Sequence, residues 1–267
     1  MSAVLEVAAG ALRRRHLLWQ LVVRDLTAAY SGSVFGNAWA VVDPAVYVAL
    51  TLFFFQFAIR GVETGGVPYV AWVLPQIIFW MYGNAVLSSS VNAVKEYGFL
   101  LRHRHFDMRL VALIKIGSAA LVHAMLMAIV LMALYLFLGV EPGWRVVLLP
   151  YYFVAMCAVL LGVAWVVAAL GAFWKDLRNV VSIVLQVEFW MSPIFWEPER
   201  FPKAVALIMY LNPFYYPIHG YRSAILQQDF GGHFWVMTAY FWIVAAVLVA
   251  GGSRLFVRLS EGFGDVV

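Results

Sequence analysis

The chain alternates long apolar segments with short polar connectors, and this alternation restricts it to a bundle of membrane-spanning helices. A helix needs about 17–25 mainly apolar residues to cross the hydrocarbon core of a bilayer, whereas barrel strands need about 9–11 residues of alternating character. The apolar segments here have the helical length, and 64% of the chain is hydrophobic while only 12% is charged. A soluble domain would have about 25% charged residues. We therefore predict an all-α integral membrane protein.

Six apolar segments are long enough to be transmembrane helices. Together they predict a transmembrane domain over residues 34–258. The segment 197–233, between the last two spans, is too polar to cross simply and too apolar for a solvated loop. We predict that it forms two short re-entrant gate helices broken at Asn212 and Pro213, because irregular backbone at membrane depth must be covered by protein. The predicted spans are residues 35–59, 67–90, 110–140, 146–173, 180–196 and 234–257.

The N-terminal region, residues 1–33, carries a helical pattern of a different kind. Over residues 11–30, leucine and valine recur at helical spacing while the charged side chains fall elsewhere. Such a pattern predicts an amphipathic helix in the membrane interface. Arginine binds phosphate oxygens in a bidentate manner, so its arginines are candidates for contacting a phosphorylated lipid headgroup, although simple attraction to anionic lipids remains an alternative. The candidates are Arg13, Arg14, Arg15 and Arg24.

The distribution of basic residues predicts the orientation in the membrane. With six spans, the N-terminus, the second and fourth connectors and the C-terminal residues 259–267 share one side. Counted with the adjoining helix ends, that side holds 13 of the 18 lysine and arginine residues. Basic connectors stay in the cytoplasm. We therefore predict a multi-pass protein of the cytoplasmic membrane with both termini cytoplasmic and residues 197–233 facing out. The net charge of +4 reflects this topology, and we expect no nucleic-acid partner.

The densest run of charge is the second connector, Val91–Arg109. We predict that it is a cytoplasmic docking element, because a charged connector cannot lie in lipid. His103, His105 and Asp107 could suggest a metal site, but three nearby arginines would repel a cation, so we expect none. Lys115, His123 and Glu188 lie in apolar segments and are functional candidates by default. The alternative is that the lysine reaches the cytoplasmic surface and that the other two are paired inside the bundle.

Aromatic residues are abundant, with 20 Phe, 13 Tyr and 11 Trp. Some must form the interfacial belts of a membrane protein. Clusters beyond that need could line a path for sugars, whose apolar faces stack on aromatic rings, although core packing remains the alternative for each. The candidate channel or gate residues are Phe53, Phe54, Phe57, Asn212, Pro213, Phe214, Tyr215 and Tyr216.

Four motifs carry a family resemblance. They are residues 17–44, Gly171–Asp176, Ser192–Ile194 and Leu211–Pro213, and their order and spacing extend along essentially the whole chain. In these motifs the chain resembles the membrane subunits of polysaccharide-exporting ATP-binding-cassette transporters, which include the O-antigen, teichoic-acid and capsule permeases.

The resemblance implies an assembly of two copies of this chain with two cytoplasmic ATPase subunits, in a bacterial inner membrane. The substrate would be a lipid-linked polysaccharide, passed through a channel between the two copies. A coupling helix at residues 92–101 would dock on the ATPase, with the connector before span five as a second element. The implied coupling residues are Asn92, Lys95, Glu96, Tyr97, Gly98, Phe99, Leu101, Lys175, Asp176 and Arg178.

The chain contains no Gly-Lys-Ser or Gly-Lys-Thr sequence, so the phosphate-binding loop of an ATPase is missing from it. We expect no cofactor in this chain, with ATP and Mg bound by the partner. Other hypotheses are a drug or small-molecule exporter of the same class, a membrane-embedded transferase and a secondary transporter. Asp43, His123 and Glu188 lie on different spans and form no evident acid–base pair, so we expect no catalytic residues. We also find no internal repeat of the kind common in secondary transporters.

Overall fold

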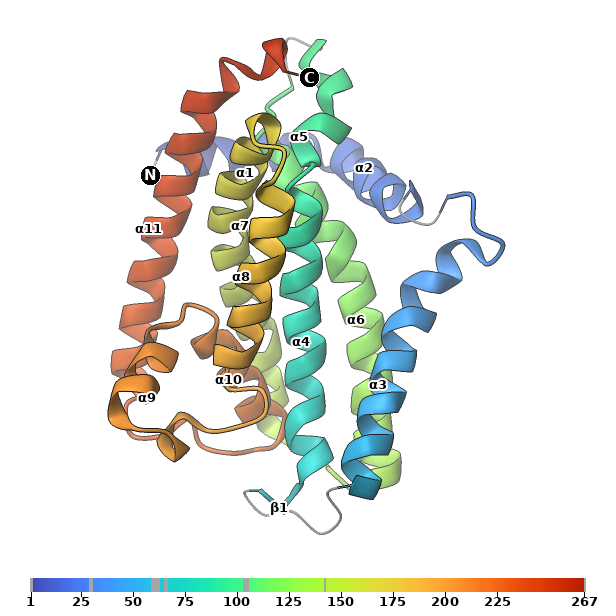
Figure 1. Cartoon of the computed structure of the whole chain (residues 1–267), viewed down its shortest axis with the longest axis vertical. Coiled ribbons are helices and arrows are strands. Elements are labelled where there is room, and N and C mark those ends of the chain that lie inside the picture. The colour runs from blue at the N-terminus through green and yellow to red at the C-terminus, as the bar shows by residue number, and fades with distance from the viewer. Residues whose placement is uncertain are drawn as a thin grey trace.

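The computed structural model shows a nearly all-helical chain, as predicted (Figure 1). Its described part contains four helices long and apolar enough to cross a membrane. These are α4 (Tyr69–Ser90), α6 (Leu110–Leu138), α7 (Leu149–Phe173) with the preceding turn η3 (Trp144–Leu148), and α11 (Phe234–Ser260). The structure describes residues 2–28, 31–58, 63–64, 67–102, 106–141 and 143–266.

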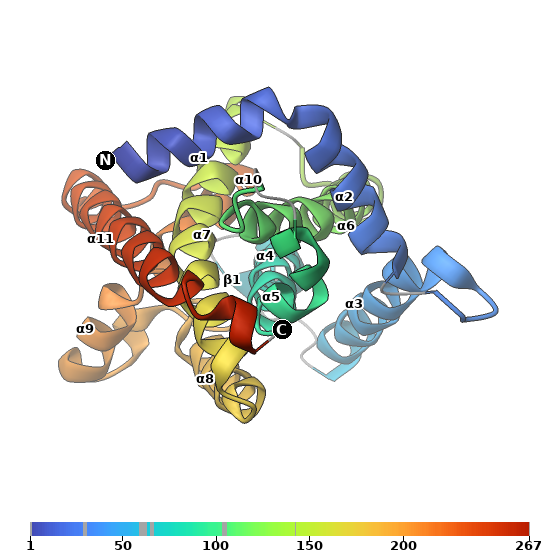
Figure 2. The ribbon, with the colours of Figure 1, turned by 90° about the horizontal axis from the view of Figure 1, so that it is seen from above.

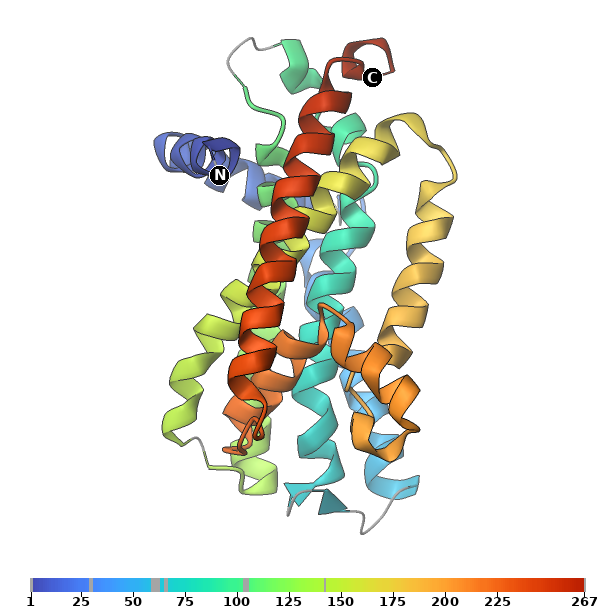
Figure 3. The same ribbon diagram turned by 90° about the vertical axis from the view of Figure 1, so that its left-hand side faces the viewer.

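Two further helices run alongside these four. They are α3 (Trp39–Ala58), which follows the short turn η1 (Gly36–Ala38), and α8 (Leu177–Met191), at the edge of the bundle (Figure 3). Helix α8 has only 15 residues, and the continuously described part of α3 is the apolar stretch Trp39–Thr51, so neither is counted among the four. A small exception to the all-helical prediction joins α3 to α4, where β1 (Glu63–Thr64) pairs antiparallel with β2 (Val67–Pro68).

The N-terminal region differs from the single helix predicted over residues 11–30. It forms α1 (Ser2–Arg13) and α2 (Arg15–Ala28), which lie across one end of the bundle and meet at Arg14 (Figure 2). The helix begins earlier because residues 2–12 are rich in alanine, leucine and valine, and alanine and leucine are strong helix formers.

The two ends of the bundle carry different short elements (Figure 1). One end holds α1 and α2, α5 (Ala93–Glu96), η2 (Gly98–Arg102) and the C-terminal turn η5 (Phe263–Asp265). Both termini therefore lie at this end. Toward the other end lie the β1–β2 pair, η4 (Pro198–Arg200), α9 (Lys203–Leu211) and α10 (Tyr215–Ile225). Helices α9 and α10 are separated at Asn212, where the sequence predicts a break.

Glycines allow the helices to approach closely at two places. A Cβ added to Gly252 on α11 would lie 2.2 Å from the carbonyl oxygen of Gly162 on α7. A Cβ added to Gly171, near the end of α7, would lie 2.0 Å from the carbonyl oxygen of Val91. Small residues at helix contacts are typical of membrane bundles, where backbone proximity provides the packing energy. The second contact fixes the start of the charged connector against α7.

Candidate functional site

The predicted coupling segment, residues 92–101, forms the two short helical elements α5 and η2 (Figure 1). Ala93, Val94 and Tyr97 are buried against the bundle, whereas Lys95 and Phe99 are exposed. The segment thus has one face packed against the bundle and one face exposed. Of the other predicted coupling residues in it, Glu96 is exposed and Asn92, Gly98 and Leu101 are half-buried.

Lys115 on α6 connects this segment to the N-terminal helices. Its ammonium nitrogen lies 2.6 Å from Asp25 Oδ1 on α2 and 2.6 Å from Glu96 Oε2 on α5. The lysine side chain is only 5% exposed. The alternative in which Lys115 reaches the cytoplasmic surface is therefore wrong, because the lysine side chain stays buried between Asp25 and Glu96.

Asp25 has further partners that complete its hydrogen bonding. Ser118 Oγ donates to Asp25 Oδ2 at 2.6 Å, and the Tyr97 hydroxyl donates to Oδ1 at 2.9 Å. Burial, reinforced by the adjacent Asp25 carboxylate, raises the pKa of Tyr97 and keeps the phenol protonated as a donor. A buried carboxylate is tolerated only when it is paired and hydrogen-bonded in this way. We call this set the polar junction; its members are Asp25, Glu96, Tyr97, Lys115 and Ser118.

The polar junction joins three segments that are far apart in the sequence, namely α2, α5 and α6. A neighbouring contact strengthens the link, because the guanidinium of Arg24 lies over the ring of Phe99, 5.0 Å from its centroid. Such cation–π contacts add about 0.5–1 kcal/mol at exposed sites. The connector is therefore held by side-chain contacts to both α2 and α6.

The other predicted lipid-phosphate residues lie apart from the junction, where α1 meets α2. Arg13 and Arg15 are exposed there, and Arg14 is half-buried. Arg24 is the exception, because its guanidinium lies over the ring of Phe99 in the connector. The structure thus separates the four arginines into a group of three and one junction neighbour.

A second ionic cluster closes the far end of the connector. The Arg109 guanidinium binds Asp107 at 2.8 Å and Glu6 of α1 at 3.4 Å, while Trp165 of α7 donates to the Arg109 carbonyl at 2.9 Å. Asp107 is therefore committed to an arginine. His103 and His105 lie outside the described residues, and the residues that the structure does describe include no group of three or more metal-ligating side chains.

The second predicted coupling element lies between α7 and α8, at the same end of the bundle as α5 (Figure 1). Lys175, Asp176 and Arg178 are all exposed there. Helix α5 contacts α7, so the two predicted elements form neighbouring parts of one end surface.

The predicted channel and gate residues do not share one surface. Phe53 and Phe54 are exposed on α3 and meet edge to face, with centroids 5.9 Å apart. By contrast, Phe214, Tyr215 and Tyr216 are buried in the protein core and Pro213 is half-buried. The side chain of Phe57 lies outside the described part of the structure.

Comparison with known proteins establishes the family. Residues 16–226 match the family described as ABC-2 type transporter. The chain belongs to this family. Similar proteins include the O-antigen export system permease protein RfbA of Myxococcus xanthus, which is 22% identical over 95% of this chain and 96% of the relative. Two RfbA proteins of Klebsiella pneumoniae are 20% and 19% identical, each over 94% of this chain and 95% of its own length.

Membership of the ABC-2 family confirms the resemblance to transporter membrane subunits. It also assigns the chain a role in transport. The polar junction thus lies in a transporter subunit, at the end where the charged connector and both termini gather.

Glu188 and His123 both have hydrogen-bond partners inside this ABC-2 subunit. This agrees with the alternative in which the two side chains are paired within the bundle. Glu188 on α8 accepts hydrogen bonds from Trp80 Nε1 at 2.5 Å, from Asn212 Nδ2 at 3.2 Å and from Ser192 Oγ. His123 is hydrogen-bonded to the Tyr221 hydroxyl at 3.1 Å. Asn212 also accepts from the backbone N–H of Phe214, so it holds the break between α9 and α10 against α8.

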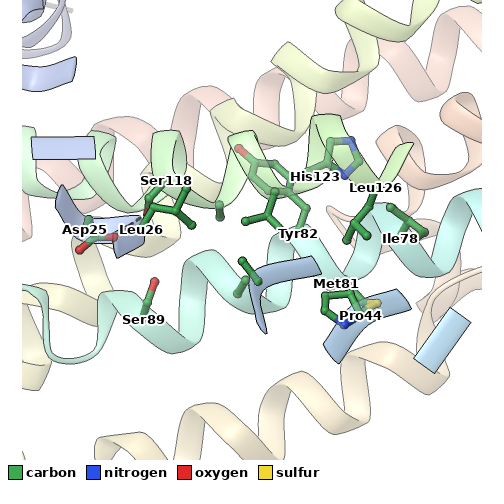
Figure 4. A pocket seen from close by; sticks show the side chains of 14 residues that line it. Asp25, Leu26, Pro44, Ile78, Met81, Tyr82, Ser89, Ser118, His123 and Leu126 are labelled. Atoms are coloured by element: carbon green, nitrogen blue, oxygen red, sulfur yellow. Dashed lines mark hydrogen bonds between the residues drawn. The ribbon is translucent and has the colours of Figure 1, made fainter. Parts of the chain in front are cut away.

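A cavity of about 270 Å³ extends from the polar junction into the bundle, between α2, α3, α4 and α6 (Figure 4). Asp25 and Ser118 lie at one end of it, and His123 with Tyr82 lies at the other (Figure 4). Its remaining lining is mainly apolar. No lysine or arginine is among the described residues that line it, and the neighbouring Lys115 is already bound to Asp25 and Glu96.

Sequence reasoning missed Asp25 and Ser118 as members of the site. A signal was present for α6, since Lys115 and Ser118 are three residues apart and so share one face of an otherwise apolar helix. No comparable signal identifies their partner, because Asp25 lies 90 residues from Lys115 in the chain.

Proposed function

We propose that this chain is the membrane subunit of an ATP-driven exporter that moves a lipid-linked polysaccharide of the O-antigen kind out of the cytoplasm. The observation that carries this proposal is the near full-length similarity to three proteins named O-antigen export permeases. Capsule and teichoic-acid polymers are substrates of the same chemical kind and remain alternatives, as does a small molecule.

The proposed assembly contains two copies of this chain and two ATPase subunits that bind ATP and Mg. The end of the bundle with α5 and both termini faces the cytoplasm, in agreement with the excess of basic residues there. Helices α3 and α8 complete a set of six spans, and α9 with α10 forms the re-entrant segment on the outer side. The polymer passes between the two copies.

Coupling in this proposal runs through the polar junction. The ATPase contacts the exposed face of α5 and η2 and the neighbouring turn at Lys175–Arg178. Closure of the ATPase pair displaces α5. Because Lys115 binds both Glu96 and Asp25, α6 and α2 move with it as rigid bodies.

Recognition of the lipid carrier is assigned to the arginines where α1 meets α2. Arg13 and Arg15 are exposed at the end of the bundle that this proposal places in the cytoplasm, and guanidinium groups bind phosphate oxygens strongly. These residues would hold a polyprenyl pyrophosphate at the entry side while the sugars pass through the channel.

Depleting the chain in its native host and analysing lipid-linked glycans inside the cell tests this function. We expect a polymer to accumulate on a polyprenyl pyrophosphate carrier. Accumulation on a glycerophospholipid would instead indicate a capsule exporter. If no glycan accumulates, the chain exports something other than a polysaccharide.

A further inference from the structure

The C-terminal turn η5 (Phe263–Asp265) lies at the same end of the bundle as α5 (Figure 1; Figure 2). Helix α11 ends at Ser260, and the Gly262 N–H then donates to the Leu259 carbonyl at 3.1 Å. Because of this bond the chain turns there instead of continuing along the helix axis. The turn brings Phe263 against the ends of α7 and α11.

Phe263 is the apolar anchor of η5. It is completely buried, whereas Gly264 and Val266, which follow it in the chain, are exposed. Its ring lies edge-on to Phe256 of α11, with centroids 5.3 Å apart and planes at 81°. It also meets Phe173, the last residue of α7, with centroids 5.9 Å apart and planes at 39°. Aromatic pairs in such arrangements stabilise beyond the area that they bury.

The turn between α7 and α8 begins directly after Phe173. Trp174, Lys175, Asp176 and Arg178 are all exposed there. The side chains of the three charged residues make no hydrogen bond and no ion pair with any described residue. Their position in space is therefore set by the backbone of the turn and by whatever holds that backbone.

Two apolar residues hold the backbone of this turn, one on each side. Leu177, the first residue of α8, is buried. Phe173 on the other side is 44% exposed, so the bundle alone covers little more than half of it. The turn η5 packs on this ring through Phe263 and through Gly262, where an added Cβ would lie 3.3 Å from Phe173 Cζ. One of the two anchors of the α7–α8 turn thus depends on η5.

We propose that Phe263 is a positioning residue for ATPase docking. It holds Phe173, and through it the charged turn over residues 174–178, in the orientation that the ATPase binds. The inference rests on the proposed function, in which the ATPase contacts this turn, and it adds η5 as a supporting element. A docking segment that is loose must be ordered on binding, and this ordering lowers the affinity. Because Phe263 is buried, it acts through Phe173 and not by touching the ATPase.

Spin-label mobility tests the positioning directly. In a chain carrying Cys157→Ala, a nitroxide attached at Lys175→Cys reports on the α7–α8 turn. A nitroxide attached at Leu12→Cys, where the leucine is 74% exposed on α1, reports on another point at the same end of the bundle. We expect Phe263→Ala to raise the mobility at position 175 and not at position 12. Phe263→Leu keeps most of the buried volume and is expected to restrain position 175 nearly as well as phenylalanine does.

The affinity of the chain for its ATPase supplies the functional readout. We expect Phe263→Ala to lower this affinity about twofold to thirtyfold, the range typical of residues that act on a site through a neighbour. Phe173→Ala is a second variant, because removal of a ring that is 44% exposed leaves the core of the bundle intact, and it should have the same effect. Val266→Ala, where the valine is 41% exposed beside Phe263, is the matched control and should leave the affinity unchanged.

Three results would overturn the inference. The first is unchanged mobility at position 175 in both Phe263→Ala and Phe173→Ala. The second is raised mobility without any loss of ATPase affinity. The third is an equal loss of affinity in Phe263→Ala and Val266→Ala, which would indicate direct contact with the ATPase.

The same binding measurement separates this inference from the proposed function. If the unaltered chain binds its ATPase and the variants bind it equally well, the proposed function survives and only the positioning role fails. If the unaltered chain binds no ATPase, the proposed function fails and the positioning role fails with it.

Discussion

Removal of the positive charge at Lys115 is expected to destabilise the protein far more than removal of the negative charge at Glu96. Lys115→Met leaves the Asp25 carboxylate, 13% exposed, without a cation. Breaking a buried ion pair by removing one partner costs about 3–5 kcal/mol, and the lower end applies because Ser118 and Tyr97 still donate to Asp25. Glu96 is 49% exposed, so its pair with Lys115 resembles a surface pair. Glu96→Gln should therefore cost at most about 1 kcal/mol.

The assay is denaturant titration of the purified protein in mixed micelles, which gives the free energy of unfolding. A double-mutant cycle then measures the interaction energy between Asp25 and Lys115. Asp25→Asn together with Lys115→Met removes both charges, so the double variant should be roughly 2 kcal/mol more stable than the sum of the two single losses predicts. Equal losses for Lys115→Met and Glu96→Gln, or strictly additive losses for Asp25 and Lys115, would refute the reasoning.

The Glu96→Gln variant also distinguishes an effect on folding from an effect on coupling to the ATPase. In the complex with its ATPase, Glu96→Gln is expected to keep ATP hydrolysis while export falls, because α5 stays folded but loses its ionic link to Lys115 of α6. Export and hydrolysis that both remain at the level of the unchanged protein would show that the junction plays no part in coupling.

Three further predictions follow from other contacts. Gly171→Ala is expected to lower the yield of folded protein, because its Cβ would collide with the Val91 carbonyl, whereas Gly251→Ala, with nothing within 4 Å, should be neutral in the same expression assay. Asn212→Ala should reduce the unfolding free energy by about 1–2 kcal/mol, since it removes a donor to Glu188 and the acceptor for the Phe214 N–H; an unchanged titration midpoint and slope would contradict the role given to Asn212. Replacing Arg13, Arg14 and Arg15 by glutamate should cause lipid-linked polymer to accumulate inside the cell, and normal glycan export by that variant would indicate that the arginines serve only as an anchor.

The helices of the bundle were predictable because apolar run length alone decides where a helix can cross a bilayer. The predicted span over residues 67–90 corresponds to α4 (Tyr69–Ser90), and that over 110–140 corresponds to α6 (Leu110–Leu138). The N-terminal region was less predictable. Its helix starts at Ser2 and divides at Arg14, although no glycine or proline marks that point.

The candidate site was predictable only in its outline. A dense run of charge between two apolar segments identified the connector, and the family resemblance implied Glu96 and Tyr97 as coupling residues within it. The pairing of Lys115 with Asp25 depends on how α2 lies across α6, which is a tertiary relation that periodicity in one segment does not contain. Burial of Phe214, Tyr215 and Tyr216 was equally hidden, because an aromatic run has the same composition whether it lines a path or fills a core.

Transport itself is tested most directly in inside-out membrane vesicles from the native host, whose outer face corresponds to the cytoplasm. Polymer that carries a radioactive sugar is made on the outer face, and a membrane-impermeant glycan-oxidising reagent then reports what remains accessible. The account predicts that polymer becomes protected in the vesicle lumen only when ATP is added and this chain is present, and that Glu96→Gln slows the process. Protection without ATP, or equal protection in vesicles that lack the chain, would contradict the assignment of this protein as an ATP-driven polysaccharide exporter subunit.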